Sequence, residues 1–171
     1  MGMILSTLEV PISEIKSRRD DLKEALLSTA ERLTKLTREE LVVRDALPKT
    51  DLNLANEVWE ATISTANNWN DWIDVTLEDQ RFLAIYGIAV LSPNPITTGI
   101  RFGVGPGPTK VVDVIQFEDI LVTENPVGIF EEPIVYKENQ YVNIDLYGKA
   151  TGKEYIALLA MVAEQAGKVT F

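Results

Sequence analysis

Apolar residues in the first third of the chain recur at the spacing of an α-helix. Separations of three, four and seven residues put them on one helical stripe, with charged residues on the opposite face. The stripe consists of Leu8, Ile12, Ile15, Leu22, Leu26, Leu33 and Leu36. Pro11 and Ser13 mark a helix start, and Arg19 interrupts the stripe between Ile15 and Leu22. The pattern predicts one long amphipathic helix.

A second, shorter helix is predicted directly after the first. Thr37 and Glu40 have the spacing of a capping box, and Pro48 is expected to end the helix that they open. Residues 1–60 are therefore predicted to form a helical arm. This arm packs on the chain's own sheet domain or docks on another subunit, and the two interpretations are compatible.

From Trp69 onward the apolar positions change to the two-residue period of β-strands. The clearest run is 141–147, where Val142, Ile144 and Leu146 point one way and Asn143 and Asp145 the other. Further runs span 80–92, 100–104, 111–120, 129–137 and 153–164, and the last favours a strand over a helix. Pro133 predicts a bulge or a sheet edge. Long strands separated by turn signals predict an antiparallel β-sandwich over residues 61–171, jelly-roll-like because its connections are long.

Two of these strands are apolar on both faces. Half-exposed antiparallel strands normally carry polar residues on their outer face, and residues 82–91 and 155–163 do not. Either the helical arm or a neighbouring copy must cover that outer face. The amount of apolar strand favours a homo-oligomer, a ring or trimer built around this sheet.

Composition narrows the range of functions. The 171 residues carry a net charge of −10 and contain no histidine and no cysteine. The charge disfavours nucleic acid as a partner. Without histidine and cysteine the chain lacks the commonest general base, the commonest zinc ligands and any thiolate nucleophile. We therefore expect no enzyme activity, no cofactor and no metal. We also read no signal peptide, and no apolar run is long enough to span a membrane.

The stretch "GIRFGVGPGPTK" at residues 99–110 resembles a phosphate-binding loop only superficially. A phosphate loop needs a helix directly after its glycines, whereas Pro106 and Pro108 are followed by the strand-like "KVVDVIQF". The stretch is predicted to be a stiffened turn between strands. Gly105 and Gly107 are candidate points of contact with a partner, because a stiff turn loses little entropy on docking.

The segment "NNWNDWIDVTLEDQ" at residues 67–80 suggests an alternative function. Trp69 and Trp72 beside Asp71 form the kind of aromatic and acidic group that binds sugars, if both rings are exposed. Buried or interface tryptophans are the commoner explanation. The acidic residues lack the spacing of a calcium loop. Carboxylate pairs such as Asp71 with Asp74 fit solvated turns better than a glycosidase site. A carbohydrate-binding or receptor-binding module thus remains as the alternative.

The overall layout resembles the capsid decoration (cement) proteins of tailed double-stranded DNA viruses. A helical arm precedes a cysteine-free, acidic sandwich, and "EEPIVYKENQYVNIDLYG" at residues 131–148 is in keeping with such sandwiches. The resemblance implies a trimer on the capsid surface, made in the host cytoplasm and bound to the major capsid protein without catalysis. Candidate interface residues are Ile12, Ile15, Leu22, Leu26, Leu33, Leu36, Gly105 and Gly107.

Overall fold

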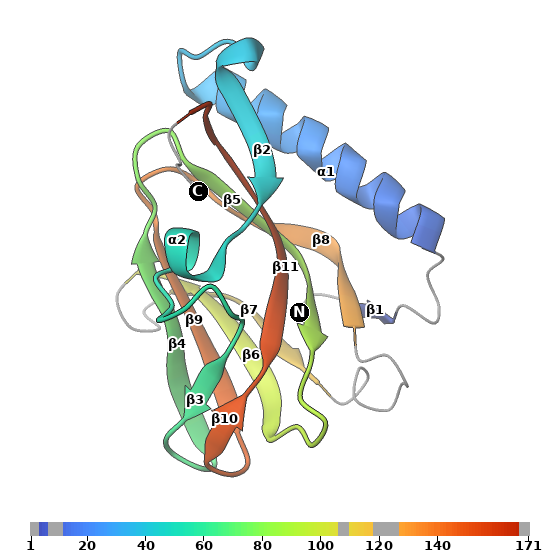
Figure 1. Ribbon diagram of the computed structural model, residues 1–171, viewed down its shortest axis with the longest axis vertical. Helices are drawn as coiled ribbons and strands as arrows, with labels where there is room; N and C mark the ends of the chain where they lie inside the picture. Colours follow the sequence, from blue (N-terminus) through green and yellow to red (C-terminus); the bar gives the residue numbers. More distant parts are fainter. Residues whose placement is uncertain (1–3, 7–11, 106–109, 118–126, 168–171) are drawn as a thin grey trace.

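Two β-sheets pack face to face, and the long helix α1 (Ile12–Leu33) lies against one of them (Figure 1). The structure, a computed structural model, describes residues 4–6, 12–105, 110–117 and 127–167. The five-stranded sheet contains, in spatial order, β1 (Ile4–Ser6), β8 (Val127–Tyr136), β5 (Phe82–Val90), β11 (Ile156–Gln165) and β2 (Leu41–Asp45). The four-stranded sheet contains β4 (Asn68–Thr76), β9 (Tyr141–Gly148), β6 (Thr97–Val104) and β7 (Lys110–Gln116). The other elements are the paired strands β3 (Ala61–Ile63) and β10 (Gly152–Glu154), the 3₁₀ turn η1 (Arg38–Glu40) and the short helix α2 (Pro48–Leu52).

The strand order is that of a jelly roll. Along the chain, β2, β4, β5 and β6 alternate between the sheets, β6 and β7 pair within one sheet, and β7, β8, β9 and β11 alternate again. This path gives the spatial orders β2-β11-β5-β8 and β4-β9-β6-β7, with all ladders antiparallel. Two interleaved Greek keys of this kind define a jelly roll. The predicted β-sandwich with an N-terminal helix is confirmed.

The main core lies between the inner faces of the two sheets. On β9 the alternation seen in the sequence puts Val142, Ile144 and Leu146 inward, and all three are fully buried. Phe102 of β6 meets Phe130 of β8 edge to face, with ring centroids 5.8 Å apart. Aromatic pairs of this geometry add stability beyond the area that they bury. The inward residues therefore fix which side chains of each strand face outward.

Helix α1 covers part of the outer face of the five-stranded sheet of its own chain. Its residues Leu22, Leu26, Leu27 and Ala30 form a second buried cluster with strand residues. The strand residues of that cluster are Leu41, Phe82, Ala84, Met161 and Ala163. These include outer-face positions of the two strands that are apolar on both faces. The arm thus packs on its own sheet, one of the two alternatives that the sequence left open.

Only part of the predicted apolar stripe lies on the face of α1 that is buried against the sheet. Leu22 and Leu26 are buried, Leu36 is half-buried against the same cluster, and Leu33 is 42% exposed. Ile12 and Ile15 belong to α1, but their side chains and all of Leu8 lie outside the described residues. Leu27 and Ala30, outside the predicted stripe, complete the buried surface.

The second predicted helix is wrong over residues 41–45, which form β2. The amide of Thr37 does donate to the Glu40 carboxylate at 2.7 Å, as in a capping box, but the turn that it caps ends at Glu40. The chain then becomes extended, because its β-branched residues pair with β11. Pro48 begins α2 instead of ending a helix, a position where its missing N–H costs nothing. Part of the predicted arm therefore belongs to the five-stranded sheet.

The predictions for the last strands are confirmed. Residues 153–164 are extended, in β10 and β11. The β5–β8 ladder shifts register between Ile85 and Gly87, opposite the segment that contains Pro133, so the predicted bulge is present. Gly87 lies in this irregularity, where a Cβ would stand 2.5 Å from the carbonyl oxygen of Gly128.

Candidate ligand-binding face of the four-stranded sheet

The outer face of the four-stranded sheet gathers polar and aromatic side chains from neighbouring strands. Because Val142, Ile144 and Leu146 point inward, Asn143 and Asp145 of β9 point outward. The register then defines three rows across the sheet. They are Trp69–Tyr147–Gly99–Gln116, Asp71–Asp145–Arg101–Val114 and Asp74–Asn143–Gly103–Val111.

Arg101 is the central cation of this face. Its Nη2 and Nε lie 2.7 and 3.1 Å from Oδ2 of Asp145. Its guanidinium carbon lies 4.4 Å from the centroid of the Trp69 ring, a cation–π contact. Trp69 also meets Tyr147 edge to face, with centroids 5.4 Å apart. These contacts tie β4, β6 and β9 together and hold the indole in one orientation.

Asp145 is a buried carboxyl beside a second carboxyl. It is 1% exposed, and Asp71 stands directly opposite it on β4. Burial raises the pKa of Asp145, the ion pair with Arg101 opposes that rise, and hydrogen bonding and charge from Asp71 add to it. Asp145 is therefore a buried carboxyl with a raised pKa that stays hydrogen-bonded to Arg101.

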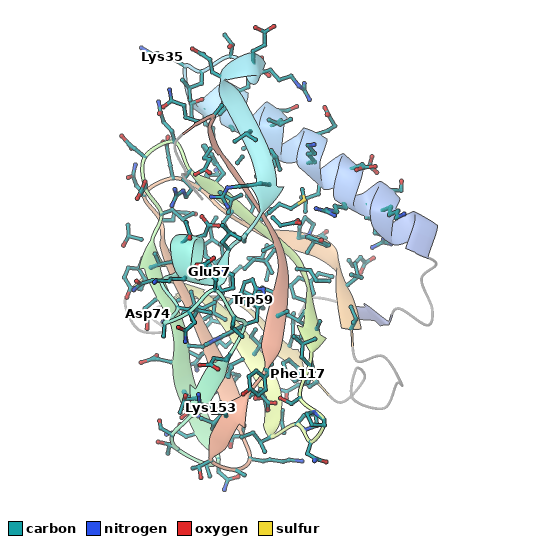
Figure 2. All side chains as sticks on the ribbon, viewed as in Figure 1. Lys35, Glu57, Trp59, Asp74, Phe117 and Lys153 are labelled. Carbon is teal, nitrogen blue, oxygen red and sulfur yellow. The ribbon has the colours of Figure 1, made fainter. Side chains whose placement is uncertain are left out.

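A second polar group lies one row along the sheet. Oδ1 of Asp74 accepts hydrogen bonds from Nδ2 of Asn143 at 2.6 Å and from the hydroxyl of Tyr141 at 3.3 Å. Asp74 lies on β4 (Figure 2). Oδ1 of Asn143 and Oδ1 of Asp145 are both buried and have no hydrogen-bond partner among the described residues. This face thus holds two acceptors without donors.

The two tryptophans of the predicted sugar platform do not share one face. Trp69 is half-buried on the outer face, with exposed Asp71 in the next row. Trp72 occupies a bulge in β4, where its indole N–H donates to the Glu60 carbonyl at 3.0 Å. Its ring packs against the core, with its centroid 6.3 Å from that of Trp59. Residues three apart on a strand point to opposite faces, so Trp72 lies on the core side of β4. The bulge beside it returns Asp74 to the outer face that carries Asp71.

Sequence reasoning missed Arg101 and Tyr147 as members of this face. The two-residue period of 141–147 predicts that Asn143 and Asp145 point outward. Which side chains of the adjacent strands lie beside them depends on the register between strands, and the local sequence pattern does not give that register. Gly105, one of the predicted contact glycines, has φ of 99° and donates its amide to the Tyr141 carbonyl at 3.1 Å. The predicted turn therefore does use a left-handed glycine. Gly107 lies outside the described residues.

A separate cluster of buried charges holds β2, α2 and β11 together. Arg44 binds both oxygens of Asp51 at 2.6 and 2.8 Å, and its Nε lies 2.8 Å from Glu164. Arg81 binds the other oxygen of Glu164 at 2.9 Å. The hydrogen bond from Arg44 to Asp51 raises the pKa of Arg44 despite its burial. Two cations balance two anions, so we assign this cluster to stability.

Two grooves flank α1. The first, about 290 Å³, lies between α1 and β2 and includes Lys16, Arg19, Lys23 and Arg44. Arg19 is paired with Asp45 at 2.6 Å, and Arg44 belongs to the buried cluster. The second, about 320 Å³, is mainly apolar and lies between α1 and the irregular part of β8. Within the described residues, no group of three or more acidic side chains is placed to hold a metal ion.

Comparisons with known proteins add no family assignment. No protein-family model, curated protein or solved structure matches the chain significantly. In the part of the chain that the structure describes, no helix is long and apolar enough to cross a membrane. By its fold and its candidate site, the protein is a jelly-roll β-sandwich with a helix on one sheet and a polar, aromatic outer face on the other.

Proposed function

We propose that this protein is a non-enzymatic structural protein of a virus particle, a decoration protein that stabilises the capsid shell through multivalent contacts. The observation that carries the proposal is the jelly-roll order of the two sheets. Viral capsid and lectin domains share this order, and both act by contact with other molecules. The major capsid protein is the proposed partner, and the virion the proposed location.

The packing of α1 supports a rigid contact module. Leu26 and Ala30 are buried on the chain's own sheet, so the helix is held against the sandwich by apolar packing. Apolar side chains that remain exposed include Val111 and Val112 on the edge strand β7 and Val135 on β8. Each exposed apolar side chain of this kind would contact the capsid only weakly, but a trimer would present each of them three times. Multivalency therefore converts weak contacts into stable attachment.

Co-sedimentation with empty shells of the virus's major capsid protein tests the proposal. We expect the chain to pellet with shells and to behave as a trimer by light scattering. Val112→Lys should weaken pelleting, whereas Val58→Lys, at an equally exposed valine between α2 and β3, should leave it unchanged. A chain that stays in the supernatant at every concentration would refute the proposal.

A further inference from the structure

We infer that the outer face of the four-stranded sheet binds a neutral carbohydrate. This inference goes beyond the decoration role and does not depend on it. The residues that carry it form what we call the β9 strip. They are Trp69, Asp71, Arg101, Gln116, Asn143, Asp145 and Tyr147.

An aromatic ring and an amide converge over a glycine at one end of the strip. A Cβ on Gly99 would stand 3.6 Å from Cη2 of Trp69 and 3.3 Å from Oε1 of Gln116. The missing side chain lets the indole reach across β9 and approach the amide of Gln116. Tyr147 supports the indole from the side at 5.4 Å. Aromatic rings pack against the C–H faces of sugars, and an adjacent amide can both donate to and accept from their hydroxyls.

Polar groups continue from this end along the sheet. Asp71 is exposed and offers carboxylate oxygens, and Arg101 is held by Asp145 with its guanidinium beside the indole. Because Arg101 is fixed by the ion pair and by the ring, little side-chain entropy is lost when a ligand binds beside it. Preorganised polar groups around an aromatic surface are typical of sites that orient small polar ligands.

Two buried acceptors on the same face have no donor. Oδ1 of Asn143 and Oδ1 of Asp145 belong to residues that are each 1% exposed, and neither oxygen has a hydrogen-bond partner among the described residues. Buried polar atoms in folded proteins nearly always have a partner. Because both oxygens are buried, waters held in place beneath the hydroxyl groups of a bound sugar would supply the missing donors.

The charge of the strip selects a neutral ligand. Asp71 and Asp145 of the strip, together with Asp74 opposite Asn143, outnumber Arg101, and the whole chain carries −10. Phosphate, sulfate and uronic acid groups would be repelled there. Neutral oligosaccharides satisfy the acceptors without that penalty, so they are the ligand class to test.

An array of neutral oligosaccharides, followed by calorimetric titration of the bound ones, tests the inference on the full chain. We expect Trp69→Ala and Gln116→Ala each to weaken binding about tenfold or more, because truncating a central contact dominates affinity. Tyr155→Ala is the matched aromatic control, since Tyr155 is 38% exposed and lies between β10 and β11. The Tyr155→Ala variant should bind the sugar with the same affinity as the unmodified chain.

Chemical-shift mapping on the unmodified chain keeps the test valid if Trp69→Ala misfolds. Bound sugar should perturb the amides of Trp69, Asp71 and Gln116 and leave those of α1 unchanged. Three results would each overturn the inference: no neutral sugar bound at millimolar concentration, shifts confined to another face, or a protein segment found on the strip instead. Shell attachment is measured separately, so failure here leaves the decoration proposal standing.

Discussion

Glu164 joins the buried Arg81 to the half-buried Arg44, and replacing it with glutamine measures how much this pairing contributes to stability. Glu164 is 1% exposed and accepts from Nε of Arg44 at 2.8 Å and from Nη2 of Arg81 at 2.9 Å. Glutamine keeps the shape and one acceptor but removes the charge. The buried cluster then holds two cations and only the carboxylate of Asp51.

The expected loss follows from what each arginine retains. Removing one partner of a buried ion pair costs about 3–5 kcal/mol, because the other charge stays buried and unpaired. Arg44 keeps its two hydrogen bonds to Asp51, and Arg81 keeps the exposed Glu78 at 3.8 Å. We therefore expect the lower end, about 3 kcal/mol. For a chain of this size that corresponds to a fall in Tm of about 6–12 °C.

Urea unfolding followed by circular dichroism gives the free energy directly. Asp45→Asn is the control, because its ion pair with Arg19 is exposed on both sides and should contribute at most about 1 kcal/mol. A loss below about 1 kcal/mol for Glu164→Gln, equal to that of the control, would refute the reasoning that the buried charges depend on one another.

Three further predictions concern other parts of the molecule. Because the pKa of Asp145 is raised in the folded chain, the folded state binds this proton more tightly than the unfolded state does. Its contribution is therefore present at pH below the ordinary carboxyl pKa and is lost as pH rises through the raised pKa. Asp145→Asn should remove that part of the pH dependence, and parallel curves of unfolding free energy against pH for the two proteins would contradict this. Gly87→Ala should destabilise the fold by about 1–3 kcal/mol, because its Cβ meets the Gly128 carbonyl oxygen at 2.5 Å; an unchanged urea midpoint would argue against that contact. Leu26→Ala should cost about 2–5 kcal/mol and increase binding of an apolar dye, because it loosens α1 from the sheet; the exposed Leu33→Ala should do neither.

Periodicity in the sequence predicted the faces of most strands correctly. Val142, Ile144 and Leu146 face the core and Asn143 and Asp145 face outward, as the two-residue period requires. The apolar outer positions of β5 and β11 indicated that something covers that face. The structure identifies the cover as α1, because Leu26 of the helix and Phe82 of β5 belong to one buried cluster.

Local patterns failed where pairing between distant strands decides the outcome. Residues 41–45 follow a capping-box pattern that suggests a helix, yet β2 forms because β11 offers a partner for every residue of it. Asp71 and Asp74 share the outer face of β4, although they are three residues apart, because one extra residue bulges out of β4 opposite β9. Neither event leaves a signal in a window of neighbouring residues.

The sequence by itself determined the fold class, the amphipathic helix and the inward or outward direction of most strand residues. These properties depend on neighbours along the chain, whose spacing is fixed by backbone geometry. Tertiary structure alone decided which residues meet. Arg44, Arg81 and Glu164 form one cluster, and Trp69 and Gln116 converge over Gly99, although they are far apart in sequence. Strand register brings them together, and register is set by packing of the whole core, which no short stretch of sequence encodes.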